Sequence, residues 1–112
     1  MPTSHDSPEV PEGAAVFPLI PPELGVHPLL LAALHAVVFL QGSEPGIVNA
    51  DAADEQMEYM AGYLQRLSGA ELQRVREDLE TLAGFAKDEG WDVDAVQFVK
   101  DFLSDFGVGS SD

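Results

Sequence analysis

The residues that could do chemistry in this 112-residue chain are few. His35 lies in an otherwise apolar stretch, and Asp54, Glu55 and Glu58 follow later at spacings of about one helical turn. A histidine and carboxylates that face each other in a helical bundle can hold a metal ion. However, the paired Glu-x-x-His motifs of such sites do not occur. A small metal-binding protein or enzyme that uses His35 and these acids is therefore an alternative, and a hydrogen-bonded core histidine is the simpler interpretation.

Other reaction chemistry has no support in the sequence. Cysteine is absent, which excludes a thiolate nucleophile and a cysteine-based metal site. No serine lies in a glycine-flanked nucleophile motif, and neither glycine-rich phosphate-binding motif occurs. The acidic stretch 88–94 lacks the glycine position and the final glutamate of a calcium-binding EF-hand loop. We therefore expect no enzymatic activity, no metal and no cofactor.

The charge of the chain is strongly one-sided. Twenty Asp and Glu residues against five Lys and Arg residues give a formal net charge of -15, and no base precedes Arg66. Nucleic acid and anionic membrane surfaces repel such a chain, so we expect direct binding to neither. The charge favours a basic protein partner. The lack of cysteine suits a reducing compartment, and we expect a cytoplasmic location.

The apolar pattern indicates an all-α protein. Apolar residues at spacings of three and four predict four helices, at about 28–40, 51–67, 69–88 and 93–106. Tyr59 and Tyr63 are expected to widen the apolar stripe of the second helix. Helices joined by such short links form a small antiparallel four-helix bundle or an orthogonal helical array.

Several residues at the predicted helix ends have the right chemistry to stop or start a helix. Asn49 or Asp51 can cap the second helix, and Ser68 with Glu71 fits a capping box, in which two side chains bond first-turn N–H groups. Gly90 suits the position after the third helix, where a left-handed backbone is common. His27, before a proline, is expected to cap the first helix or to face solvent.

The charged residues of the third helix indicate a solvated surface. Arg74 and Arg76 precede Asp78 and Glu80 by four residues, the spacing at which side chains meet on one helix face. We expect surface ion pairs worth about 0.2–0.5 kcal/mol each, and no anion-binding site.

A single helical domain is expected over residues 16–107. Seven of the eight prolines fall within the first 28 residues, and residues 1–15 have the composition of a disordered acidic, proline-rich tail. The stretch after this tail is expected to form an extended arm, pinned to the body by its apolar side chains. Residues 108–112 are expected to be a frayed end.

Two surfaces are candidates for function. The first is an acidic patch, formed by Glu44, Asp51, Asp54, Glu55 and Glu58. The second is an apolar interface on the arm and on the first helix, which is apolar in nearly every direction around its axis. Its candidate residues are Phe17, Leu19, Ile20, Leu30, Leu31 and Phe39.

These features favour a non-enzymatic acidic protein-interaction module of the adaptor, inhibitor or immunity type. Its expected partner is a basic protein, or a second copy of the chain in a homodimer. A structural homo-oligomer is a further alternative.

Overall fold

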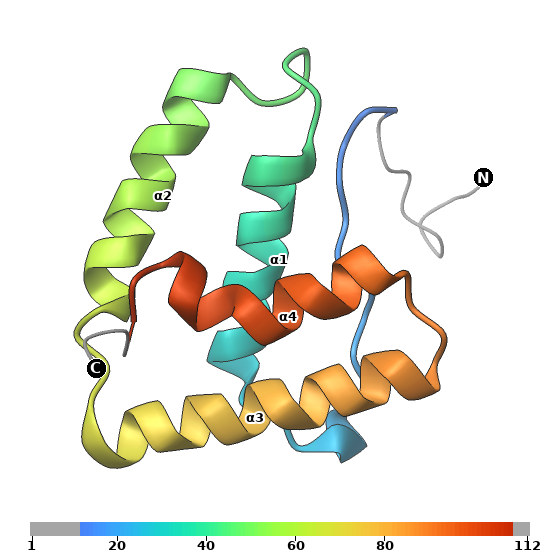
Figure 1. Ribbon diagram of the computed structural model, residues 1–112. Helices are drawn as coiled ribbons and strands as arrows, with labels where there is room; N and C mark the ends of the chain where they lie inside the picture. Colours follow the sequence, from blue (N-terminus) through green and yellow to red (C-terminus); the bar gives the residue numbers. More distant parts are fainter. Residues whose placement is uncertain (1–11, 109–112) are drawn as a thin grey trace.

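The fold consists of helices and their connections throughout the part of the chain that the structure, a computed structural model, describes (residues 12–108, Figure 1). Within that range the helices are η1 (Pro22–Leu24, a 3-10 helix), α1 (Pro28–Gly42), α2 (Ala50–Leu64), α3 (Gly69–Asp88) and α4 (Val93–Asp105). The prediction of an all-α fold is confirmed. Residues 1–11 and 109–112, which hold most of the predicted tail and frayed end, lie outside the described residues.

The four α-helices form two antiparallel hairpins that run across one another (Figure 1). One hairpin consists of α1 and α2, and the other of α3 and α4. Of the two architectures that the sequence allows, the arrangement is therefore the orthogonal array.

The core lies where the two hairpins cross. The fully buried large side chains come from α1, α3 and α4: Leu34, Val37, Leu82, Val99 and Phe102. Within α2, by contrast, Ala53 is the one buried residue. Because α2 covers the core from one side only, its outer side remains in contact with solvent.

An aromatic cluster holds the segment before α1 against the body. The Phe17 ring is 3% exposed and lies edge-on to His35 of α1, with 5.2 Å between the ring centroids. It also lies edge-on to Trp91, at 5.4 Å, and to Phe98 of α4, at 6.3 Å. Edge-to-face pairs at such distances are favourable beyond the area that they bury. One side chain of the arm thus joins α1, α4 and the α3–α4 link.

The folded part of the chain begins before the predicted boundary of the tail. The Glu44 N–H donates to the Gly13 carbonyl at 2.8 Å, and the Ala15 N–H donates to the Ser43 hydroxyl at 2.9 Å. These bonds fasten residues 13–15 to the loop between α1 and α2. The expectation of a disordered tail up to residue 15 therefore does not hold for residues 13–15.

A Schellman motif ends α3 at the predicted glycine. Gly90 has φ +77, and its N–H donates to the Lys87 carbonyl at 3.1 Å. The Trp91 N–H donates to the Ala86 carbonyl at 2.9 Å. This pair of bonds satisfies last-turn carbonyls and turns the next side chain, Trp91, onto the core.

A second Schellman motif ends α4. Gly107 has φ +74, and the Val108 N–H donates to the Leu103 carbonyl at 2.9 Å. The same geometry turns Val108 inward, and its side chain is buried. Val108, expected in the frayed end, is therefore part of the core.

The starts of α1 and α2 follow the sequence signals, whereas the start of α3 does not. His27 accepts the Leu29 N–H at 3.1 Å, and Asn49 accepts the Ala52 N–H at 2.9 Å. Ser68 occupies the N-cap position of α3 but makes no side-chain capping hydrogen bond. Gly69 has φ +58, a left-handed conformation that breaks the regular first turn assumed by a capping box. The predicted capping box is therefore wrong.

The predicted end of the second helix is also too late. The N–H groups of Arg66 and Leu67 donate three residues back, to the carbonyls of Tyr63 and Leu64, at 3.0 Å each. Such tighter turns replace the regular α-helical ladder, so α2 ends at Leu64.

Two helix glycines are open to stabilising substitution. Gly62 in α2 and Gly84 in α3 are exposed, and nothing lies within 4 Å of a Cβ added at either position. Alanine at each position should raise the free energy of unfolding by about 0.5–1 kcal/mol, because alanine loses less backbone entropy on folding. Urea denaturation measures the change. The matched control is Gly42→Ala, whose Cβ would lie 2.8 Å from the Ala15 Cβ, and a stabilising effect there would contradict the described packing.

Candidate functional site

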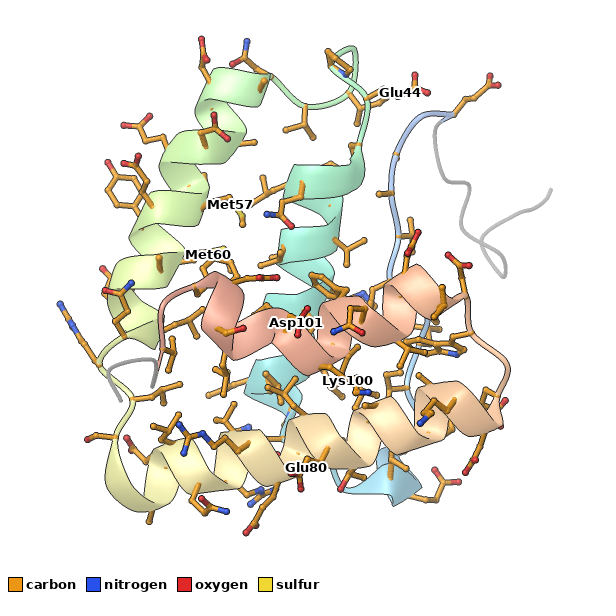
Figure 2. All side chains as sticks on the ribbon, in the orientation of Figure 1. Glu44, Met57, Met60, Glu80, Lys100 and Asp101 are labelled. Atoms are coloured by element: carbon orange, nitrogen blue, oxygen red, sulfur yellow. The ribbon has the colours of Figure 1, made fainter. Side chains whose placement is uncertain are left out.

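The outer side of α2 carries acids in successive turns. Asp51, Asp54, Glu55 and Glu58 are all exposed. Figure 2 shows Met57 pointing from α2 toward α1, and the helical period places Asp51, Glu55 and Glu58 away from this inward side. Asp54, three residues before Met57, lies at the border of the two sides and lines a pocket with Met57. Four of the five residues in the predicted acidic patch therefore share one helix surface.

Helix-end electrostatics explain only part of this acidic surface. Asp51 lies in the first turn of α2, where the helix dipole favours a carboxylate. Glu55 and Glu58 lie beyond the first turn, where that effect acts. Like charges one turn apart also destabilise a helix, by about 0.2–0.5 kcal/mol per pair. In the described range, the one ion pair joins Arg74 and Asp78 on α3. The acids of α2 are therefore not balanced by a described ion pair.

Glu44 does not join the acids of α2. It lies in the α1–α2 loop, on the side toward the N-terminal segment (Figure 2). A Cβ added at Gly13 would lie 2.9 Å from the Glu44 Oε1, so the carboxylate packs closely over that glycine. The structure thus divides the predicted patch into four residues on α2 and one in the loop.

Two tyrosines border the acids. Tyr59 and Tyr63 are 56% and 65% exposed. The Tyr59 hydroxyl donates to the Glu55 Oε2 at 3.4 Å, and the Arg66 guanidinium lies 4.9 Å from the centroid of the Tyr63 ring. The prediction that both tyrosines widen the apolar stripe is wrong. Tyr59 follows Glu55 by four residues, and Tyr63 follows Tyr59 by four. This spacing was the signal that the two tyrosines continue the row of polar side chains that includes Glu55.

The predicted apolar interface is divided between core and surface. Phe17 and Leu30 are buried in the core, and Ile20 and Leu31 are partly buried against it. The burial of Phe17 and Leu30 removes them from any exposed interface of the folded chain. Leu19, at 89% exposure, and Phe39 remain at the surface.

One exposed apolar residue outside the predicted interface is Leu29, which is 75% exposed. It lies at an open groove of about 480 Å³, where α1 meets the end of α2 and the start of α3. Leu64, Leu67 and Val75 supply apolar walls. The apolar pattern did not identify Leu29 as exposed because nearly every residue around it is also apolar.

His35 has a packing role in the described structure. It is partly buried, and its ring lies against Phe17. Within residues 12–108, no group of three or more His, Cys, Asp or Glu side chains is placed to hold a metal ion. The structure therefore does not bring His35 together with the α2 acids as the metal-binding alternative requires.

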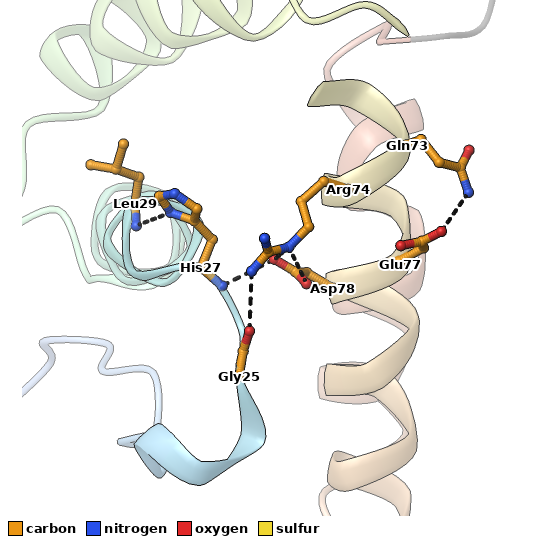
Figure 3. A network of polar contacts seen from close by, with 7 residues as sticks. All are labelled: Gly25, His27, Leu29, Gln73, Arg74, Glu77 and Asp78. Carbon is orange, nitrogen blue, oxygen red and sulfur yellow. Dashed lines mark hydrogen bonds and ion pairs between the residues drawn. The ribbon is translucent and has the colours of Figure 1, made fainter. Parts of the chain in front are cut away.

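Asp78 forms a partly buried polar clasp that the sequence analysis took for a surface ion pair (Figure 3). Its side chain accepts the Arg74 Nε–H at 3.0 Å and the backbone N–H of His27 at 3.0 Å. The Arg74 Nη2 also donates to the Gly25 carbonyl, at 3.3 Å. Asp78 is 7% exposed because the chain leading into α1 passes over it. The expectation of a surface pair is therefore wrong for Arg74 and Asp78, which fasten α1 to α3.

Comparison with protein-family models, with curated protein sequences and with solved structures found no match. Among the described helices, none combines the length and the apolar character needed to cross a membrane. The surfaces described above are therefore the features of this chain that bear on its function.

Proposed function

We propose that this chain is a non-enzymatic, acidic protein-interaction module that binds a basic protein through the outer face of α2. The observation that carries the proposal is the combination of Glu55 and Glu58 with the exposed Tyr59 and Tyr63 on the outer side of one helix. We define this α2 face by these four residues together with Asp51 and Asp54.

The chemistry of the α2 face suits a surface rich in lysine and arginine. Carboxylates attract basic side chains and accept their hydrogen bonds, and tyrosine rings accept cations on their faces. The stacking of Arg66 on Tyr63 is an example of that second contact within the chain itself. Tyrosine is also enriched at protein interfaces, where it buries a large area at little cost in side-chain entropy.

A recognition role also fits the rigidity of the scaffold. Acids on a helix that is held by its inner side keep fixed spacings, which favours selective binding over diffuse attraction. We place this role in the cytoplasm, since a chain without cysteine is suited to a reducing compartment. Adaptors, inhibitors and immunity proteins are the classes of module that act in this way.

A triple charge reversal tests the α2 face. Changing Asp54, Glu55 and Glu58 to lysine should reduce recovery of the partner from native lysate at least about tenfold, because several favourable ion pairs become repulsive. Quantitative mass spectrometry of saturably bound proteins measures the recovery. Raising the ionic strength should weaken binding of the unmodified chain in the same assay.

The matched control reverses three exposed acids at helix C-termini, Asp88, Glu89 and Asp105. It changes the net charge by the same amount, and lysine suits the negative end of a helix dipole. Partner recovery should stay within about twofold of the unmodified chain. Equal losses in both triple variants would show that bulk acidity, rather than the α2 face, attracts the partner.

A further inference from the structure

Three of the five basic residues converge on one groove between α3 and α4. Arg76 and Lys87 from α3 and Lys100 from α4 line this groove, which has a volume of about 630 Å³. Figure 2 shows Lys100 on the side of α4 that borders α3, with Glu80 on α3 below it. The groove therefore holds three positive charges and one negative charge in a chain whose net charge is -15.

The other two bases have partners within the chain, whereas the groove bases form no ion pair in the described range. Arg74 pairs with Asp78, and that pair is the one described between residues 12 and 108. Arg66 stacks on Tyr63. In a chain with twenty acids, three bases left outside ion pairs at one groove indicate that their counter-charge comes from another molecule.

The shape of the groove follows from the helical period of α3. Its α3 wall consists of residues at spacings of three and four: Arg76, Leu79, Glu80, Ala83, Gly84 and Lys87. The two bases at the ends of this row lie eleven positions apart, which corresponds to about 16 Å along the helix. Gly84, which is exposed and has no side chain, lies between them next to the buried Ala83, so a partner backbone can approach α3 closely at Gly84. From α4, Leu103 lines the groove with the small part of its surface that is exposed.

We propose that this basic groove binds an acidic amphipathic helix of a partner protein. A helix laid along α3 would place its small residues against the exposed Gly84 and Ser104, because Leu79, Ala83 and Leu103 are nearly buried at this groove. Acids about three turns apart on the same helix would then reach Arg76 and Lys87. Charge disfavours a second copy whose groove faces this one. The two grooves, each of net positive charge, would repel one another, and so would the two chains, each of net charge -15.

A steric plug tests this proposal without disturbing the fold. Nothing lies within 4 Å of a Cβ at Gly84, so Gly84→Leu extends into open space at the groove. The matched control is Gly62→Leu, which makes the same change at an equally open position on α2. The charge test is Lys100→Glu, and its control is Arg66→Glu, outside the groove. Urea denaturation checks that all four variants remain folded.

The probe is a synthetic helical peptide with alanine and leucine on one face and glutamates about three turns apart. Titration into the ¹⁵N-labelled full chain should give saturable shifts centred on the amides of residues 76–87 and 100–108. Gly84→Leu and Lys100→Glu should each raise the dissociation constant about tenfold, and the two control variants should change it less than about twofold.

Three results would overturn the proposal. One is the absence of saturable shifts at about 1 mM peptide in low salt. Another is equal binding of a peptide with the same composition in scrambled order, which would show attraction by charge alone. The third is concentration-dependent dimerisation of the unliganded chain that Gly84→Leu abolishes, which would assign the groove to a second copy. None of these results bears on the α2 face, because the triple reversal there leaves the groove residues unchanged.

Discussion

Phe17→Ala is expected to lower the free energy of unfolding by about 3–5 kcal/mol, a large part of the 5–15 kcal/mol typical of a domain. The substitution removes the ring that contacts His35, Trp91 and Phe98 and leaves a cavity in the core. The arm then loses its main anchor to the crossing helices. Urea denaturation monitored by the fluorescence of Trp91, the only tryptophan in the chain, measures both the stability and the change around the indole.

The control is Leu19→Ala, two residues along the same arm. Leu19 is exposed, so its truncation should change stability by less than about 0.5 kcal/mol. A loss below about 1 kcal/mol for Phe17→Ala would contradict the description of the arm as part of the core.

Asp78→Ala is expected to cost about 2–3 kcal/mol. It leaves the partly buried His27 N–H without its acceptor and removes the partner of Arg74. Most of the loss should come from the backbone N–H, because Arg74 is half exposed and water can solvate its guanidinium. Arg74→Ala should therefore cost less than Asp78→Ala in the same denaturation assay.

Glu77→Ala is the matched control for the Asp78 clasp. Glu77 is exposed and accepts a hydrogen bond from Gln73 on the same helix at 3.1 Å, so its loss should cost less than about 0.5 kcal/mol. Similar losses for Glu77→Ala and Asp78→Ala would mean that Asp78 does not fasten α1 to α3.

Local chemistry made most of the secondary structure predictable. The apolar stripe of α3 and the glycine after it agree with the structure because both depend on neighbours within one or two turns. Ser68 shows the limit of such signals. The sequence motif is present, but the left-handed Gly69 breaks the regular first turn that the capping box assumes.

Long-range packing could not be predicted from those signals. The spacing of Arg74 and Asp78 indicates an ion pair, but their partial burial depends on where residues 25–27 cross α3. In the same way, the sequence does not distinguish Phe17 from the other apolar residues of the arm. Its burial depends on contacts with residues far away in the sequence, such as Trp91. The acids of α2 were predictable as a group because one helical period defines their surface. Glu44 lies in the α1–α2 loop, so the helical period does not define its position. Its distance from the acids of α2 depends on the path of that loop.

The two proposed surfaces differ in charge and lie on different helices. The α2 face is acidic, whereas the groove between α3 and α4 is basic. A module with both surfaces could bind a basic partner and an acidic helix together, as an adaptor does. The charge of each surface also discriminates against the partner of the other, since like charges brought together cost free energy.

Site-specific photo-crosslinking tests the α2 face most directly. A photoreactive phenylalanine analogue at Gly62 occupies open space on α2, and the same group at the exposed Glu77 on α3 is the control. In native lysate, we expect the group at Gly62 to give a saturable crosslink to a basic protein that weakens in about 0.5 M salt. The control position should give none. Equal crosslinks from both positions, or no saturable crosslink from Gly62, would contradict recognition by the α2 face.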